Sequence, residues 1–368
     1  MAEKYIGLMS GTSMDGVDAV LVEIDDNKTH IIDAISFPMG DNLKQALLDI
    51  CLGQATNLQA IGELDHRLGH LFADAVDALL SKANVPAHQI KAIGSHGQTV
   101  FHAPEAHYPF TMQLGDANII SAKTGICTVA DFRRKDMAFG GQGAPLVPAF
   151  HQQLFSDSNI TRVILNIGGI ANITLLKPDY KVIGYDTGPG NMLSDAWISR
   201  YLNSPYDKDA AWAQTGSVNK GLLEAMLSDS YFTQPAPKST GRELFNLPWL
   251  DKHLESQPNI KPQDTQATLI ELSAITIAAE VATFTSSTTN ELLVCGGGVH
   301  NPLLMRRLAE LLPEWQVMST NERGIDSDNM EAMAFAWLAY RTLHHLPGNL
   351  PEVTGASHAI PLGAIYPA

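Results

Sequence analysis

Two stretches of the chain share one plan, in which a β-rich run, a glycine-containing turn and a second β-rich run follow one another directly. The first is GLMSGTSMDGVDAVLVEI at residues 7–24, and the second is RVILNIGGIANITLL at residues 162–176. Aliphatic and β-branched runs joined by a glycine turn predict β-hairpins. Two similar hairpins, about 155 residues apart, predict two related α/β halves.

The segments around these hairpins predict further strands and helices. A strand at 183–186 (IGYD) is expected to end at Asp186 and to lead into TGPGN, and a third glycine turn in ELLVCGGGVHNPLLMRRLAELL joins a strand to a helix at 291–312. A short strand is expected over ICTVADF at 126–132. Apolar side chains recurring on one stripe predict four long helices, at 42–52, 57–83, 267–284 and 328–345.

A chain of 368 residues is long enough for two domains of roughly 150–200 residues each. We predict a first domain at 1–135 that also takes in a returning C-terminal tail at about 350–368. The second domain covers 136–349, and the boundary is set only to within tens of residues.

Composition excludes several classes of protein. A net charge of −15 argues against a protein that wraps nucleic acid or lies on an anionic membrane. No uninterrupted apolar run approaches the length of a membrane span, and the first residues lack a signal-peptide pattern. The three cysteines lie far apart, so neither a disulfide framework nor a cysteine-based zinc site is expected. A cytoplasmic protein is the expectation.

The first glycine turn lacks the lysine of a P-loop, because Gly16 is followed by Val17. The triple-glycine turn lacks the third glycine of the dinucleotide-binding fingerprint. What remains is a turn that can aim backbone N–H groups, with the hydroxyls of Ser10, Thr12 and Ser13, at an anion. An ordinary hairpin turn explains the same residues, since Gly, Ser and Asp are favoured in turns.

The glycine turns taken together resemble the actin-like, hexokinase and heat-shock ATPase superfamily, in which ATP lies in a cleft between two RNase H-like domains. More specific motifs follow in order along nearly the whole chain. They are GLMSGTSMDGVD, GSHGQT, VADFRRKDMAFGGQGAPLVP, LNIGGIAN, GYDTGPGN, PKSTGRELF and CGGGVHNPLL. Together they resemble the anhydro-N-acetylmuramic acid kinases of bacterial cell-wall recycling.

The resemblance implies an α/β protein with two RNase H-like (actin-like ATPase) domains flanking an interdomain cleft. It also implies a phosphotransferase with an alcohol acceptor. Such a kinase uses ATP, Mg²⁺ and water to open the ring of 1,6-anhydro-N-acetylmuramic acid and to phosphorylate O6, giving N-acetylmuramic acid 6-phosphate and ADP. A homodimer is implied as well. The alternatives are another sugar or acetate-type kinase of the same fold, and a non-catalytic sugar sensor or actin-like assembly protein.

The resemblance also assigns roles to particular residues. Asp186 matches the family's catalytic aspartate, and Asp15 could face a Mg²⁺-bound water, so that no direct metal ligand is certain. Residues expected to border ATP are Gly11, Thr12, Ser13, Met14, Asp15, Gly16, Val17, Asp18, Gly168, Gly169, Asn172, Gly296, Gly297, Gly298, His300 and Asn301. Residues expected to bind the sugar are Ser95, His96, Gln98, Arg133, Gly141 and Glu331.

Structural explanations stay open for several of these residues. Asp186 and Asp15 could simply stabilise turns. Of the neighbouring Arg133 and Arg134, only one is expected to face the sugar's lactyl carboxylate, because successive strand residues point to opposite sides. Glu331 fits a capping box with Asp328 as the N-cap of the last long helix, as well as a sugar contact.

Overall fold

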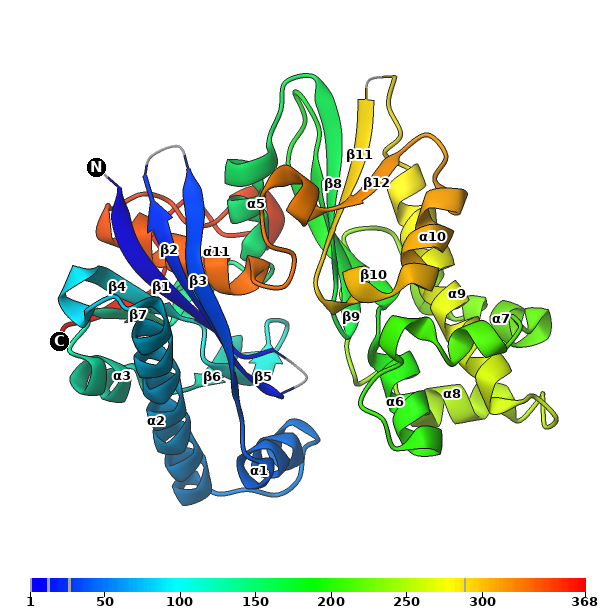
Figure 1. Ribbon diagram of the computed structural model, residues 1–368, viewed down its shortest axis with the longest axis horizontal. Coiled ribbons are helices and arrows are strands. Elements are labelled where there is room, and N and C mark those ends of the chain that lie inside the picture. The colour runs from blue at the N-terminus through cyan, green and yellow to red at the C-terminus, as the bar shows by residue number, and fades with distance from the viewer. Residues whose placement is uncertain (1, 12–13, 26–27, 288) are drawn as a thin grey trace. The chain divides into compact units, whose positions relative to one another are not determined.

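The computed structural model describes residues 2–11, 14–25, 28–287 and 289–368, which form two compact units (Figure 1). The first unit holds Met1–Leu154 with Asn329–Ala368, and the second holds Phe155–Asp328. Helix α11 (Met330–Leu343) therefore belongs to the first unit, whereas the sequence-based division placed it in the second domain. The division into two domains that fold independently stays a prediction, because a compact unit is not by itself shown to fold alone.

The first unit is built on a six-stranded sheet with the order β13-β7-β4-β1-β2-β3. Strands β1, β2 and β3 form an antiparallel meander, while β4 runs parallel to β1 and β7 parallel to β4. The predicted first hairpin is thus confirmed as β1–β2. The strand bounds are β1 Glu3–Met9, β2 Gly16–Ile24, β3 Thr29–Pro38, β4 Ile90–Ser95, β7 Thr128–Ala130 and β13 Ala364–Tyr366.

Side-chain alternation along β1 decides which helix covers which face of this sheet. Ile6 and Leu8 point into a core that includes residues of α2 (Leu58–Ala83). Gly7 points the other way, where a Cβ would lie 1.8 Å from the backbone oxygen of Ala332 in α11. The absence of a side chain at Gly7 therefore lets α11 pack directly on the strand.

The remaining elements of the first unit surround this sheet, and β5 pairs with β6 as a separate two-stranded ribbon. Helix α3 precedes β7, which is shorter than the strand expected over residues 126–132. The strand alternation expected at Arg133 and Arg134 was wrong, because both residues lie in helix α4, which begins at Phe132. The bounds are α1 Asp41–Cys51, α3 Ala117–Thr124, α4 Phe132–Ala138, α5 Val147–Phe155, α12 Pro351–Thr354, β5 Gln98–Ala103 and β6 Phe110–Leu114, with a 3₁₀ turn, η1, at Ala87–Gln89.

The second unit repeats the strand plan of the first. Its five-stranded sheet has the order β10-β9-β8-β11-β12, with an antiparallel meander β8–β9–β10 and parallel strands β11 and β12. This matches the order β3-β2-β1-β4-β7 of the first unit. Two α/β units with the same three-antiparallel, two-parallel order confirm the predicted pair of RNase H-like domains. The strand bounds are β8 Ile160–Ile167, β9 Ile170–Leu176, β10 Ile183–Pro189, β11 Thr289–Cys295 and β12 Gln316–Ser319.

Two helices, α9 and α10, pack against this second sheet and share one apolar core with it. A separate apolar cluster joins α6, α7 and α8 to the first half of α9. Among the described residues, no helix combines the length and the apolar character needed to cross a bilayer. The helix bounds are α6 Met192–Leu202, α7 Lys220–Leu227, α8 Leu247–Leu254, α9 Pro262–Ala282 and α10 Pro302–Leu311, and the 3₁₀ turns are η2 Lys208–Ala210, η3 Ala213–Thr215, η4 Ser230–Thr233, η5 Gly297–His300 and η6 Thr320–Arg323.

Candidate active site

The turn between β1 and β2 contains the predicted ATP loop, although Thr12 and Ser13 lie outside the described residues. Met14 takes a positive φ of 54° and donates its backbone N–H to the oxygen of Gly11 at 3.2 Å. The side chains of Met14 and Val17 are buried in the core. At these two positions, only the backbone can face a ligand.

The polar residues of this loop differ in exposure. The carboxylate of Asp15 is exposed and accepts a hydrogen bond from the ammonium of Lys44. A Cβ on Gly16 would lie 2.3 Å from the oxygen of Phe37, so close strand packing explains this glycine. Asp18 is half-buried on β2. Asp15 is therefore the acidic group of the loop that solvent and a hydrated cation can reach.

The β8–β9 turn of the second unit lies against the end of β10. The oxygen of Gly168 accepts the N–H of Asn191, and the oxygen of Gly169 accepts the N–H of Gly190, both at 2.9 Å. A Cβ on Gly190 would lie 2.4 Å from the oxygen of Gly168. The two backbones thus approach each other more closely than residues with side chains allow.

The triple-glycine turn after β11 approaches the end of β8 in the same way. Gly296 has a φ of 78°, and its Cβ would lie 2.4 Å from Oδ1 of Asn166. A Cβ on Gly298 would lie 2.3 Å from the side chain of Ile167. Together with Gly297, these residues present backbone rather than side chains, which suits close approach of a phosphate.

His300 and Asn301 follow this turn, and each has a partner within the second unit. Nε2 of the exposed His300 lies 2.8 Å from Oδ1 of Asp328. The side chain of Asn301 accepts the N–H of Leu304 at 3.0 Å and so caps the N-terminus of α10. Asn301 therefore has a structural role, and its proposed contact with ATP would be an additional one.

Asp186 lies inside β10, so the prediction that it ends a strand was wrong. It faces Asn172 of β9 across the sheet, and the register shifts between Asp186 and Gly188. Its Oδ2 accepts the N–H of Thr240 at 3.0 Å and the hydroxyl of Ser239 at 3.1 Å. A tertiary contact, rather than a local turn, therefore orients this carboxylate.

Burial, together with the nearby carboxylate of Glu243, raises the pKa of Asp186 to about 6. The donors from Thr240 and Ser239 act in the opposite direction, because they stabilise the ionised form. Both donors are neutral. A carboxylate with such a pKa is ionised at neutral pH yet basic enough to accept a proton.

Three predicted sugar-binding residues meet in the first unit around Arg133. Nε of Arg133 donates to Nε2 of His96 at 2.9 Å, and Nη1 donates to the oxygen of Gly143 at 2.9 Å. Nδ1 of His96 lies 2.8 Å from the oxygen of Gly97, so this nitrogen carries the ring proton. Burial, and next the charge of Arg133, hold the pKa of His96 well below its ordinary value, so the ring is neutral.

Glu331, near the start of α11, belongs to the same group of charges. Burial raises the pKa of Glu331, Arg133 opposes that rise, and Asp18 adds to it. The N-cap of α11 is Asn329, without a side-chain capping hydrogen bond, so the predicted capping box with Asp328 was wrong. The side chain of Glu331 is therefore held by tertiary electrostatics beside a guanidinium.

Ser95 and Gln98 lie at the ends of β4 and β5 and are almost completely buried. Oε1 of Gln98 accepts the hydroxyl of Ser10 at 2.7 Å, which ties the first glycine turn to the sugar-binding group. The hydroxyl of Ser95 is buried without a hydrogen-bond partner. Ser95 and His96 line a polar hollow of about 290 Å³.

A buried acid that the sequence did not single out shapes the loop around Gly141. Asp136 is completely buried and accepts hydrogen bonds at 2.9 Å from Gly143 N–H, Asn349 and Thr354. A Cβ on Gly141 would lie 2.1 Å from its Oδ2. Gly141 is therefore required for this packing. Its contact with the sugar stays a prediction.

The site includes other residues for which the sequence suggested no role. Ser239 and Thr240 lie in PKSTGRELF, a motif that supported the family resemblance but not a contact with Asp186. Asp136 lies in another such motif, VADFRRKDMAFGGQGAPLVP. The sequence pointed to Ser239, Thr240 and Asp136 only because they belong to these motifs. The partner of each is between 7 and 218 residues away in the chain, so spacing alone could not identify it.

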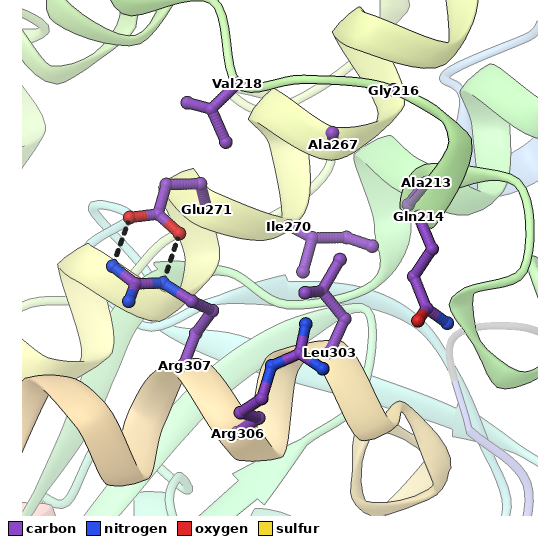
Figure 2. A pocket seen from close by; sticks show the side chains of 10 residues that line it. All are labelled: Ala213, Gln214, Gly216, Val218, Ala267, Ile270, Glu271, Leu303, Arg306 and Arg307. Atoms are coloured by element: carbon purple, nitrogen blue, oxygen red, sulfur yellow. Dashed lines mark hydrogen bonds and ion pairs between the residues drawn. The ribbon is translucent and has the colours of Figure 1, made fainter.

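A hollow of about 370 Å³ lies between α9, α10 and η3 of the second unit (Figure 2). Ile270 and Leu303 contribute apolar walls, and Gln214 contributes an amide. At one side the guanidinium of Arg307 donates two hydrogen bonds of 2.8 Å to the carboxylate of Glu271. Leu303, which lines the hollow, follows Pro302, the first residue of α10, which comes after the glycine turn in the chain.

A buried carboxylate with a pKa near 6 and turns that present backbone N–H groups are features found in catalytic and anion-binding sites. They occur here in a protein of two RNase H-like units. The family model of anhydro-N-acetylmuramic acid kinase matches residues 3–368. The chain belongs to this family.

Relatives that carry this family name are similar to the chain over 99–100% of its length. The anhydro-N-acetylmuramic acid kinase of Photobacterium profundum is 70% identical over 372 residues, covering 100% of this chain and 99% of the relative. That of Vibrio cholerae is 60% identical, covering 100% and 99%. That of Pasteurella multocida is 58% identical, covering 99% and 96%.

Proposed function

We propose that the protein is an ATP-dependent kinase that opens 1,6-anhydro-N-acetylmuramic acid and phosphorylates O6, giving N-acetylmuramic acid 6-phosphate and ADP in peptidoglycan recycling. Family membership supports the reaction. The single structural observation that carries the proposal is Asp186, whose buried carboxylate has a pKa of about 6 and neutral hydrogen-bond donors.

In the proposed reaction, Asp186 accepts a proton from water as the water oxygen bonds to C1 of the sugar. The bond between C1 and O6 breaks, and O6 takes the electron pair. O6 then attacks the γ-phosphorus in line, and the bond to the ADP oxygen breaks. Because O6 is phosphorylated rather than protonated, one carboxylate replaces the two that an inverting glycosidase needs.

We assign recognition of the sugar to the first unit. Arg133 suits the lactyl carboxylate, because a guanidinium can bind a carboxylate through two parallel hydrogen bonds. Its contacts with His96 and Gly143 orient the guanidinium in advance. Ser95, Gln98 and Glu331 offer hydroxyl, amide and carboxylate groups suited to sugar hydroxyls. Gly141 would let the backbone approach the ring.

We assign ATP to the glycine turns, with the phosphates next to Gly11–Asp18, Gly168–Gly169 and Gly296–Gly298. Asn172 and His300 would border the nucleotide. The hollow between α9, α10 and η3 is proposed to hold the adenosine. Leu303 and Ile270 suit the faces of a base, and Gln214 suits its polar edge. Mg²⁺ bound with ATP would neutralise phosphate charge, keep several waters and interact with the exposed carboxylate of Asp15.

The test is a coupled assay with the anhydro sugar and ATP in ¹⁸O-labelled water. We expect ADP and sugar 6-phosphate in equal amounts, with one labelled oxygen at C1. A kinase that phosphorylates an intact hydroxyl would form ADP without label at C1, and that result would favour the alternative sugar or acetate-type kinase. A sensor or assembly protein would form no product.

Two further properties are proposed on the same grounds. The protein is expected to act in the cytoplasm, where ATP is available, and as a homodimer. Sedimentation or light scattering would give the molecular mass in solution, and a value near 39.8 kDa would contradict the dimer.

A further inference from the structure

Lys238 is a buried cation in the second unit. Its side chain is 2% exposed, and its Nζ lies 2.7 Å from Oε1 of Glu280 in α9. Nζ also donates to the oxygens of Tyr231 and Phe232 at 3.4 Å and lies 5.0 Å from the centre of the Tyr231 ring. Lysine is rarely buried unless it is paired, because removing an ammonium from water is costly. This ammonium is therefore held at one place by several partners.

The backbone of the same residue touches Asp186. The N–H of Asp186 donates to the oxygen of Lys238 at 3.0 Å. The next two residues, Ser239 and Thr240, supply the two donors to the Asp186 carboxylate. The Tyr231 hydroxyl donates to the backbone oxygen of Asp186 at 2.7 Å. Both the backbone and the carboxylate of Asp186 are thus held by residues that Lys238 anchors.

Glu280 links this anchor to β10 from the other side. Its Oε2 accepts the hydroxyl of Tyr185 at 2.8 Å, and Tyr185 precedes Asp186 in the strand. One chain of contacts therefore runs from Lys238 through Glu280 of α9 to Tyr185 of β10. It connects the Ser239–Thr240 segment, which we call the donor segment, to α9 and β10. Loss of the Lys238 side chain would loosen the donor segment, while the pairing of β10 with β9 keeps Asp186 in its strand.

We propose that Lys238 is a positioning residue, which acts through Glu280 and Tyr231 to hold the Ser239–Thr240 donors on the carboxylate of Asp186. Its catalytic consequence rests on the proposed role of Asp186 as the base. The charged and titratable groups that face this carboxylate or its supports are Tyr185, Tyr231, Lys238, Glu243 and Glu280.

The direction of the effect follows from the donors. The hydrogen bonds from Ser239 and Thr240 lower the pKa of Asp186, so their loss raises that pKa above about 6. In Lys238→Met the ammonium is absent, and the donor segment is released. The acid limb of the kcat profile therefore moves to higher pH. The KM values for ATP and sugar change little, because neither ligand is assigned to Lys238.

The experiment compares Lys238→Met, Lys238→Arg and the control Lys252→Met, which removes an exposed lysine of α8 in the same unit. Thermal melts identify the folded variants. We expect Lys238→Met to shift the acid limb of kcat upward by about one pH unit, which lowers kcat about twofold near pH 7 and roughly tenfold near pH 5. Lys238→Arg should restore most of the activity, because the guanidinium can still pair with Glu280. The control should match the parent protein.

A second readout separates this proposal from the function itself. Carbon-13 NMR of labelled aspartate side chains, with Asp186→Asn identifying the resonance, follows the carboxyl titration without turnover. A higher pKa of Asp186 in Lys238→Met supports the positioning role even if the kinase reaction is not found. An unchanged titration in the folded variant overturns it. If Lys238→Met does not fold, the uncharged Lys238→Gln takes its place, with the same expected and contrary results.

Discussion

The two units share a strand order, but the charged groups of their candidate sites have different partners. In the first unit, Arg133 has the imidazole of His96, a backbone oxygen and the nearby carboxylate of Glu331 as partners. In the second unit, the donors to the carboxylate of Asp186 within the described part of the chain, Ser239 and Thr240, are neutral, and burial raises its pKa to about 6. Charges with opposite partners suit the binding of a polar substrate, whereas a buried carboxylate with neutral donors suits proton transfer.

The largest effect is expected from a change of the candidate base in the second unit. Asp186→Asn should lower kcat by about 10²- to 10⁴-fold, because the amide cannot accept the proton. ATP binding, measured by calorimetry, should persist. The control is Asp179→Asn, at an exposed position with a φ of 55° that asparagine tolerates. Normal turnover in Asp186→Asn would remove the proposed base.

A change at Arg133 tests whether the first unit binds the sugar. Arg133→Lys loses the fork that reaches His96 and Gly143, so the KM for the sugar should rise roughly 10- to 100-fold with a smaller change in kcat. Arg134→Lys, at the exposed neighbouring position, is the matched control. A rise in KM confined to the control would transfer the role to Arg134.

The pH dependence should come from the second unit. Because Asp186 must be ionised to accept a proton, kcat/KM should fall about tenfold per pH unit below a pKa of about 6. Burial and the charge of Arg133 hold the pKa of His96 well below its ordinary value, so this imidazole should not add a second limb near neutral pH. Steady-state rates from about pH 5 to about pH 9 test this sign. A rate that rises with acid would contradict it.

A stability effect without a matching change in the reaction is expected at Asp136 of the first unit. Asp136→Asn weakens charge-assisted hydrogen bonds to the glycine loop and the C-terminal segment, which should lower the free energy of unfolding by about 1.5–3 kcal/mol. Urea unfolding measures the loss. Asp74→Asn, at an exposed ion pair, should change stability much less. Equal losses in both variants would argue against a special role for Asp136.

The smallest expected effect concerns the adenosine hollow. Leu303→Trp places a larger side chain in a hollow of about 370 Å³, so the KM for ATP should rise several-fold while the KM for the sugar stays constant. Leu202→Trp, at an exposed site on α6, is the control. If ATP kinetics do not change in the folded variant, adenosine binds elsewhere.

Local patterns were enough to predict the regular elements. Glycine turns between aliphatic runs predicted the hairpins β1–β2 and β8–β9, and apolar stripes predicted α1, α2, α9 and α11. These signals lie within a few residues of one another, so they need no knowledge of the fold. The short strand before α4 was predicted too long, because residues 126–132 do not reveal where the sheet ends.

The candidate site was predicted as a set of residues but not as a set of contacts. Asp186, Arg133 and Glu331 were named from motifs, whereas the capping box at Asp328 was a local interpretation that the structure replaced. Lys238 was not named, because nothing in its neighbourhood indicates that it pairs with Glu280, 42 residues further along the chain.

The sequence by itself determined the repeated strand–glycine–strand plan, the family and the identity of the candidate catalytic residue. These depend on residue type and order. Only the tertiary structure decided the chemical state of Asp186, since its pKa depends on burial and on donors 53 and 54 residues away. The same holds for Asp136, whose partners come from two segments, around Gly143 and at 349–354. Burial and long-range hydrogen bonds are properties of the folded chain, and no local pattern encodes them.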